Sequence, residues 1–118
     1  MLFLYLLHFD EPIAHAQHYL GSTERLQTRL KEHATGHGST LTTEFHKRAI
    51  GFTVARVWIV QHRTAEQIAK HQKNAPSMCW ICNPENQRFN IGESVTITRL
   101  QKSGIRTRWT HNAPKAST

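Results

Sequence analysis

Long hydrophobic runs are missing from this chain of 118 residues. The longest apolar opening, Met1 to Leu7, is interrupted by His8 and Asp10, so it is far too short to cross a bilayer. The same opening lacks the basic flank and the small-residue cleavage site of a signal peptide. We therefore expect a cytoplasmic protein with no membrane partner, built as a small globular fold with one modest core.

Cysteine is also scarce. Cys79 and Cys82 form a single Cys-x-x-Cys, and two cysteines are too few for a disulfide framework. The pair is half of a zinc site, for which His71 and His111 are the plausible additional ligands. The pattern favours two reduced, partly buried thiols over zinc, so zinc at Cys79 and Cys82 is not expected. A redox pair is a third interpretation, and no thioredoxin-like strand precedes the motif to support it.

Acidic residues are outnumbered: 8 Asp and Glu stand against 15 Lys and Arg, which gives a formal charge of +7. This excess suits a polyanionic partner such as nucleic acid, although a basic protein without such a partner has the same composition. Asp10 is the only aspartate, which argues against a nuclease built on paired aspartates. The basic tail from Gln101 is expected to fray, or to fold only on a partner.

Hydrophobic patterning predicts an α+β fold in the order β–β–α–β–α with an appended segment. Short apolar runs typical of strands occupy residues 2–9, 17–20 and 52–61. Amphipathic helices are predicted from Glu24 and from Thr64, and residues 41–50 are ambiguous but fit a short helix. We expect a small, mainly antiparallel three-stranded sheet flanked by helices.

The chain divides at residue 83 in this interpretation. Residues 1–83 form the domain just described. Residues 84–118 form a C-terminal extension with one further strand over 95–100 and a basic, flexible end.

One helical stripe carries potential chemistry. Arg25, Arg29 and His33 are spaced by four, so a helix places them on successive turns of one face. They follow closely on Tyr19-Leu20-Gly21. Arg and His beside a tyrosine suggest a site that handles a negatively charged group such as a phosphate.

Taken in order, these residues resemble the GIY-YIG nuclease family. Phe3-Leu4-Tyr5 and Tyr19-Leu20-Gly21 match the two tripeptides of that family, and Arg29 follows the second tyrosine by ten residues. His33 lies one turn later. Glu66 matches the glutamate on the helix after the third strand.

The resemblance continues beyond the glutamate. Lys70 lies four residues after Glu66, where the family usually has a lysine. The stretch KHQKNAPSMCWIC resembles the ending of small, single-domain bacterial members. The sequence departs from the pattern at Phe3, where the family has glycine, and in a longer loop, DEPIAHA. The family's late asparagine matches either Asn74 or Asn83.

The resemblance implies a catalytic set with distinct roles. Tyr5 and Tyr19 would flank the attacking water, with Tyr5 as the general base. Arg29 would contact non-bridging oxygens of the scissile phosphate, and His33 would accept a proton or orient a water. Glu66 would hold one Mg²⁺ or Mn²⁺ ion. The residues expected to contact substrate are Gly21, Arg25, Lys70 and Asn74.

The implied function is a metal-dependent endonuclease that hydrolyses phosphodiester bonds in DNA, with structured, damaged or nicked DNA as candidate substrates. The alternative is a non-catalytic nucleic-acid-binding module of the same fold. A zinc-stabilised adaptor organised around Cys79 and Cys82 is a third hypothesis. The sequence leaves the oligomeric state open between a monomer and a weak dimer.

Overall fold

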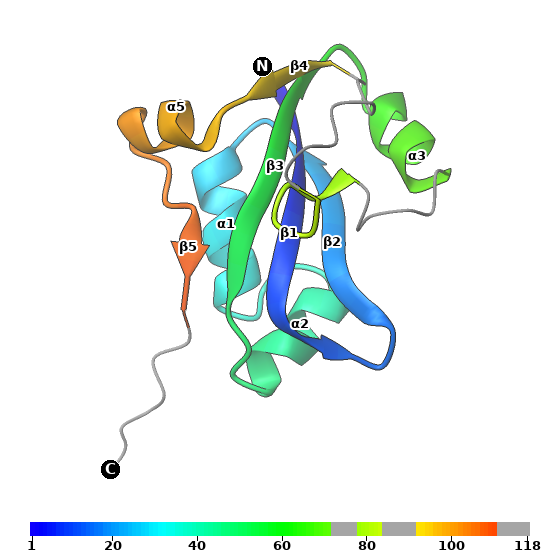
Figure 1. The fold of residues 1–118 in the computed structure, drawn as a ribbon, viewed down its shortest axis with the longest axis vertical. Helices are drawn as coiled ribbons and strands as arrows, with labels where there is room; N and C mark the ends of the chain where they lie inside the picture. Colours follow the sequence, from blue (N-terminus) through cyan, green and yellow to red (C-terminus); the bar gives the residue numbers. More distant parts are fainter. Residues whose placement is uncertain (72–77, 84–91, 111–118) are drawn as a thin grey trace.

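The fold is that of a computed structural model, which describes residues 1–71, 78–83 and 92–110 (Figure 1). It confirms the predicted α+β class. In chain order its elements are β1 (Leu2–Ile13), β2 (Ala16–Thr23), α1 (Leu26–Ala34), α2 (Thr40–Lys47), β3 (Phe52–Val60), α3 (Thr64–His71), β4 (Glu93–Val95), α5 (Ile97–Lys102) and β5 (Arg108–Trp109). None of the helices in the described ranges is long and apolar enough to cross a membrane.

The sheet has the order β2-β1-β3-β4, and β5 also pairs with β3. All of these pairings are antiparallel. The three predicted strands thus lie side by side in the order β2-β1-β3, with β2 at one edge, and the C-terminal extension adds two short strands that pair with β3. The expected DEPIAHA loop is mostly strand, because β1 continues to Ile13 and pairs there with Ala16. The hairpin turn is only Ala14-His15, and Ala14 adopts a positive φ of 53°.

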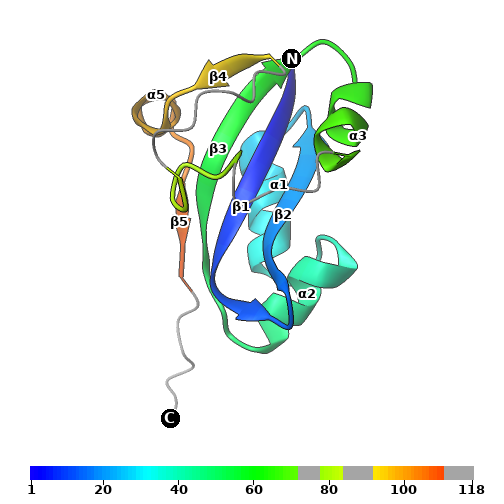
Figure 2. The ribbon, with the colours of Figure 1, turned by 45° about the vertical axis from the view of Figure 1, so that its right-hand side comes forward.

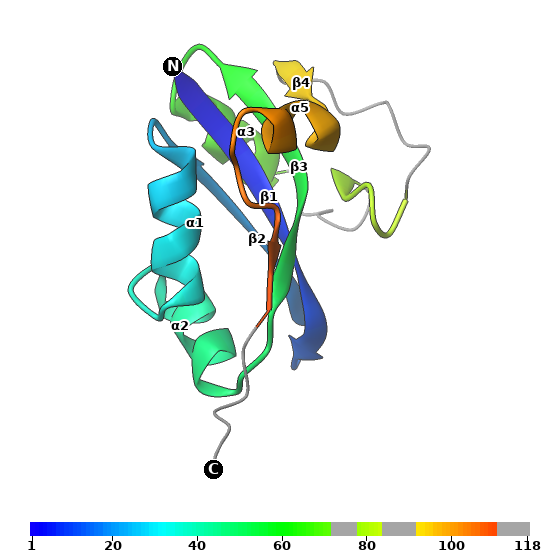
Figure 3. The ribbon, with the colours of Figure 1, turned by 90° about the vertical axis from the view of Figure 1, so that its left-hand side faces the viewer.

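Alternation along β1 gives the sheet two buried faces. Tyr5, Leu7 and Phe9 point to the face covered by α1, α2 and α5, which we call the helix face. Leu4 and Leu6 point to the opposite face, which packs against α3 and residues 78–83 and which we call the cysteine face. Figure 3 shows α1 and α2 on one side of the sheet and residues 78–83 on the other.

The ambiguous stretch after α1 is a helix. Ser39 caps α2: its side chain accepts a hydrogen bond from the Thr42 amide, and the Thr42 hydroxyl accepts one from the Ser39 amide. This reciprocal capping box satisfies two donors that a helix start leaves unpaired. Phe45 anchors the helix by stacking on Phe9, with ring centroids 3.7 Å apart.

The prediction of a strand over residues 95–100 is wrong. Of these residues only Val95 belongs to a strand, as the last residue of β4, and helix α5 begins two residues later. The Thr96 side chain accepts a hydrogen bond from the Arg99 amide, so it caps the helix and stops the strand.

The basic tail is also more ordered than expected as far as residue 110. Trp109 is buried and stacks on Phe52. Arg108 donates two hydrogen bonds of 2.7 Å to the carboxylate of Asp10, which fastens the chain end to β1. Residues 111–118 lie outside the described ranges.

Candidate active site

Two tyrosines lie side by side on the helix face. Tyr5 on β1 is opposite Gly21 on β2, and Tyr19 is two residues earlier on the same strand. Their ring centroids are 6.2 Å apart. A Cβ atom at position 21 would lie 2.6 Å from the Tyr5 hydroxyl oxygen and 2.9 Å from Tyr19. Gly21 therefore has a structural reason to lack a side chain: it makes room for the Tyr5 phenol.

A buried hydrogen-bond chain connects Tyr5 to the helix layer. The Tyr5 hydroxyl lies 2.6 Å from Nε2 of His33, and Nδ1 of His33 lies 2.8 Å from the Thr42 hydroxyl. That hydroxyl also accepts from the Ser39 amide and can donate to the Ser39 carbonyl. In this arrangement Nδ1 donates to Thr42, which leaves Nε2 to accept the Tyr5 proton.

The imidazole of His33 is held neutral. Burial lowers its pKa to about 4, and the nearby charge of Arg29 acts in the same direction. Gly38 closes over the ring, because a Cβ atom there would overlap Nδ1 of His33. The glycine-containing loop after α1 therefore shapes the site, and Thr42 is a positioning residue that the sequence did not reveal.

Arg29 approaches the same phenol from α1. Burial, with Tyr19 nearby, raises the pKa of Tyr5 well above its ordinary value, while a hydrogen bond and the charge of Arg29 act in the opposite direction. Arg29 also donates to Glu32 at 2.9 Å and remains 31% exposed. In the absence of a metal ion, Tyr5 is therefore a protonated phenol at neutral pH.

The row of Arg25, Arg29 and His33 that we predicted on one helix face contains only Arg29 and His33. The helix begins at Leu26, so Arg25 is its N-cap residue, with non-helical φ and ψ of −128° and 79°. Its side chain is exposed. Arg29 and His33 keep the predicted four-residue spacing within the helix, but Arg25 does not continue their row.

Glu66 lies near the edge of the sheet. It is in the first turn of α3, which packs on the cysteine face beside edge strand β2 (Figure 2). Its carboxylate accepts a 2.5 Å hydrogen bond from the Ser22 hydroxyl on β2. Burial is the main cause of the raised pKa of Tyr5, but the charge of Glu66 contributes too. The carboxylate is therefore within electrostatic reach of the phenol, although the two side chains belong to opposite faces.

The Glu66 carboxylate suits a hard divalent cation. Burial alone would raise its pKa, but hydrogen bonds from Lys70 and Ser22 and the positive charges nearby hold the pKa below its ordinary value. The group is thus ionised at neutral pH and about a quarter exposed. A single, partly exposed carboxylate fits Mg²⁺, which keeps several water ligands. Lys70, expected to contact substrate, forms a 2.8 Å ion pair with Glu66.

The structure brings four of the five side chains expected to be catalytic together on the helix face: Tyr5, Tyr19, Arg29 and His33. Glu66 is not part of that group. It lies on α3, where its hydrogen bonds are to Ser22 on edge strand β2 and to Lys70. Asn74, expected to contact substrate, lies outside the described residues.

A second cluster joins residues that the sequence did not connect. The sulfur atoms of Cys79 and Cys82 face His8 on β1 and His18 on β2. The expected partners were His71 and His111, but the structure describes neither the side chain of His71 nor His111. His8 and His18 are opposed residues of the hairpin, and both point to the cysteine face. That shared face is the signal that could have identified them.

The comparisons with known proteins give no relative. The chain matches no protein-family model, no curated protein and no solved structure at a significant level. The GIY-YIG resemblance therefore depends on the residues alone.

Proposed function

We propose that the protein is a metal-dependent endonuclease that hydrolyses phosphodiester bonds in DNA by a GIY-YIG-type mechanism. The observation that supports this best is the buried 2.6 Å hydrogen bond between the Tyr5 hydroxyl and Nε2 of His33, with the guanidinium of Arg29 acting on the same phenol. A structural tyrosine needs one hydrogen-bond partner for its hydroxyl. Here the neutral imidazole of His33 and the guanidinium of Arg29 act on one phenol oxygen. The imidazole can accept the phenol proton, and the guanidinium can stabilise a phosphate anion beside it.

The His33 contact gives Tyr5 a route for its proton. The Tyr5 side chain is fully buried, and the half-buried Tyr19 and Arg29 form the part of the site that meets solvent. Substrate binding must therefore open the site enough to admit the attacking water to Tyr5. As that water loses a proton to the Tyr5 oxygen, the phenol passes its own proton to Nε2 of His33. The new P–O bond forms to the water oxygen as the bond to the 3′ oxygen breaks, and solvent protonates that leaving oxygen.

Arg29 and Glu66 supply the charges for this chemistry. The guanidinium of Arg29 can pair with two non-bridging phosphate oxygens once it exchanges its contact with Glu32. Glu66 would hold one Mg²⁺ or Mn²⁺ ion, which supplies Lewis-acid stabilisation of the phosphate in the transition state. The excess of positive charge, +7 over the chain, favours binding to DNA of any sequence.

The test is nicking of supercoiled plasmid DNA by purified protein in Mg²⁺ or Mn²⁺. Arg29→Lys keeps the charge and removes the planar fork, so we expect it to reduce the nicking rate about a hundredfold. Arg48→Lys is the matched control, because Arg48 is 55% exposed at the end of α2 and, within the described part of the chain, forms an ion pair with Glu44. A chelator should abolish nicking by the wild type.

The alternative of a non-catalytic module makes a different prediction in the same assay. It predicts DNA binding, measured by gel shift, without nicking by the wild type under any divalent metal. Equal nicking by wild type and Arg29→Lys would indicate a contaminating nuclease and contradict the proposal.

A further inference from the structure

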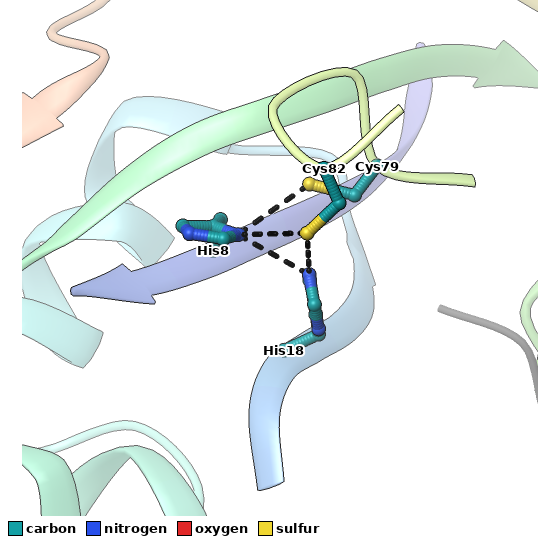
Figure 4. Close-up of side chains that lie close together, drawn as sticks. All are labelled: His8, His18, Cys79 and Cys82. Carbon is teal, nitrogen blue, oxygen red and sulfur yellow. Dashed lines mark hydrogen bonds between the residues drawn. The ribbon is translucent and has the colours of Figure 1, made fainter. Parts of the chain in front are cut away.

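The strongest site outside the candidate active site is formed by His8, His18, Cys79 and Cys82. We call it the His–Cys cluster (Figure 4). We propose that the His–Cys cluster binds one Zn²⁺ ion as a structural site. This inference does not depend on the proposed nuclease function, since the two groups of residues share no member.

The spacing of the ligand atoms matches a tetrahedral ion. With Zn–S of about 2.3 Å and Zn–N of about 2.0–2.1 Å, a tetrahedron places sulfur and nitrogen about 3.6 Å apart and two nitrogens about 3.3 Å apart. Nδ1 of His8 lies 3.5 Å from the sulfur of Cys79 and 3.6 Å from that of Cys82. Nε2 of His18 lies 3.4 Å from the Cys82 sulfur and 3.2 Å from Nδ1 of His8. All four ligand atoms lie within 4.8 Å of one another.

The ligand chemistry selects zinc. Two thiolates and two imidazoles in a tetrahedral arrangement are typical of Zn²⁺, whereas Mg²⁺ and Ca²⁺ prefer oxygen ligands. Four protein ligands leave no open coordination position for a water or a substrate, which is the arrangement of a structural site. The backbone amides of Ile81 and Cys82 donate to the sulfur of Cys79 and so help to orient it, as outer-shell partners of a metal ligand do.

Contacts with β3 hold residues 78–83, the segment that carries both cysteines, against the sheet. The Arg56 guanidinium lies between the rings of Trp58 and Trp80, 4.7 and 4.5 Å from their centroids. It also donates to the carbonyl oxygen of Met78, at 3.5 Å. Cys79 is fully buried. The segment that carries the two cysteines is therefore anchored on the cysteine face independently of any metal.

The consequence of zinc binding would be a cross-link between distant parts of the chain. His8 and Cys79 are 71 residues apart, and the ion would fasten residues 78–83 to the β1–β2 hairpin. The same hairpin carries Tyr5 and Tyr19, so zinc would rigidify the strands that position both phenols.

The direct test is the metal content of the full chain, purified without a polyhistidine tag and without added zinc. We expect one zinc per chain by elemental analysis. We also expect the metal-free protein to bind Co²⁺ with the visible bands of a tetrahedral thiolate complex. His18→Ala should weaken Co²⁺ and Zn²⁺ binding about a hundredfold or more. His15→Ala is the matched control, because His15 is exposed in the turn of the same hairpin.

A second readout does not require a folded variant. Cys82 is exposed, so a thiol reagent should modify it in metal-free wild-type protein, and zinc should protect it. Wild-type protein that binds neither Zn²⁺ nor Co²⁺ at stoichiometric concentration would overturn the proposal and leave a cluster joined by hydrogen bonds alone. Identical Co²⁺ spectra for wild type and His18→Ala would overturn it as well.

Discussion

The neutral, buried imidazole of His33 makes the stability of the protein depend on pH in a calculable way. Its pKa in the folded protein is about 4, against 6.5 for an exposed histidine. Between these values the unfolded chain binds a proton that the folded chain does not. The contribution of His33 to stability is therefore complete above pH 6.5 and is lost progressively as the pH falls toward 4.

The size of this effect follows from the two pKa values. Lowering the pH from 7.5 to 5 should reduce the free energy of unfolding by about 2 kcal/mol through His33 alone, and the limit below pH 4 is about 3 kcal/mol. Because the side chain is only 1% exposed, solvent screening does not diminish the figure much. His33→Gln, which does not titrate, should lack this component.

The assay is urea unfolding followed by tryptophan fluorescence, for wild type and His33→Gln, at pH 7.5 and at pH 5. All other groups are the same in both proteins, so their contributions to the pH dependence cancel in the comparison. We expect the wild type to lose about 2 kcal/mol more than the variant between the two pH values. Equal losses would show that His33 is not held neutral, and the Tyr5–His33 proton route would fail with it.

Three further substitutions test the packing around the site. Gly21→Ala should destabilise the protein by about 1–3 kcal/mol in urea unfolding, because the new methyl group overlaps the Tyr5 phenol; a neutral result would contradict the close contact. Thr42→Val should cost about 1–3 kcal/mol by leaving the buried Nδ1 of His33 without its hydrogen-bond partner, whereas Thr42→Ser should retain most of the stability. Trp109→Ala should cost about 3–5 kcal/mol if the tail packs as described, and a change below about 1 kcal/mol would indicate a frayed tail.

The sequence predicted the fold well where periodicity is strong. The apolar run of β3 and the amphipathic pattern of α1 both predicted the right element. It failed over residues 95–100, where Val95 and Ile97 alternate as in a strand but Thr96 caps a helix. Local hydrogen bonding, which a hydrophobic pattern does not record, decides that case.

For the candidate site, the sequence predicted which residues share one face of a helix better than it predicted which helices and strands come into contact. Arg29 and His33 were placed correctly because four residues make one helical turn. The position of Glu66 beyond the edge of β2 depends on how α3 packs, and His18 meets Cys82 only through tertiary folding. The linear sequence carries no pattern that predicts the contact of Glu66 with β2 or that of His18 with Cys82. It does indicate that His8 and His18 face each other on paired strands.

The measurement that most directly tests the proposed nuclease is the initial rate of Mg²⁺-dependent plasmid nicking by Glu66→Gln, compared with Glu44→Gln. Glu44 is a partly exposed carboxylate on α2, and its ion pairs are with Lys47 and Arg48. We expect Glu66→Gln to lose at least about a hundredfold in rate and Glu44→Gln to match the wild type. Equal rates for the two variants, or no cleavage by the wild type in any divalent metal, would contradict the assignment.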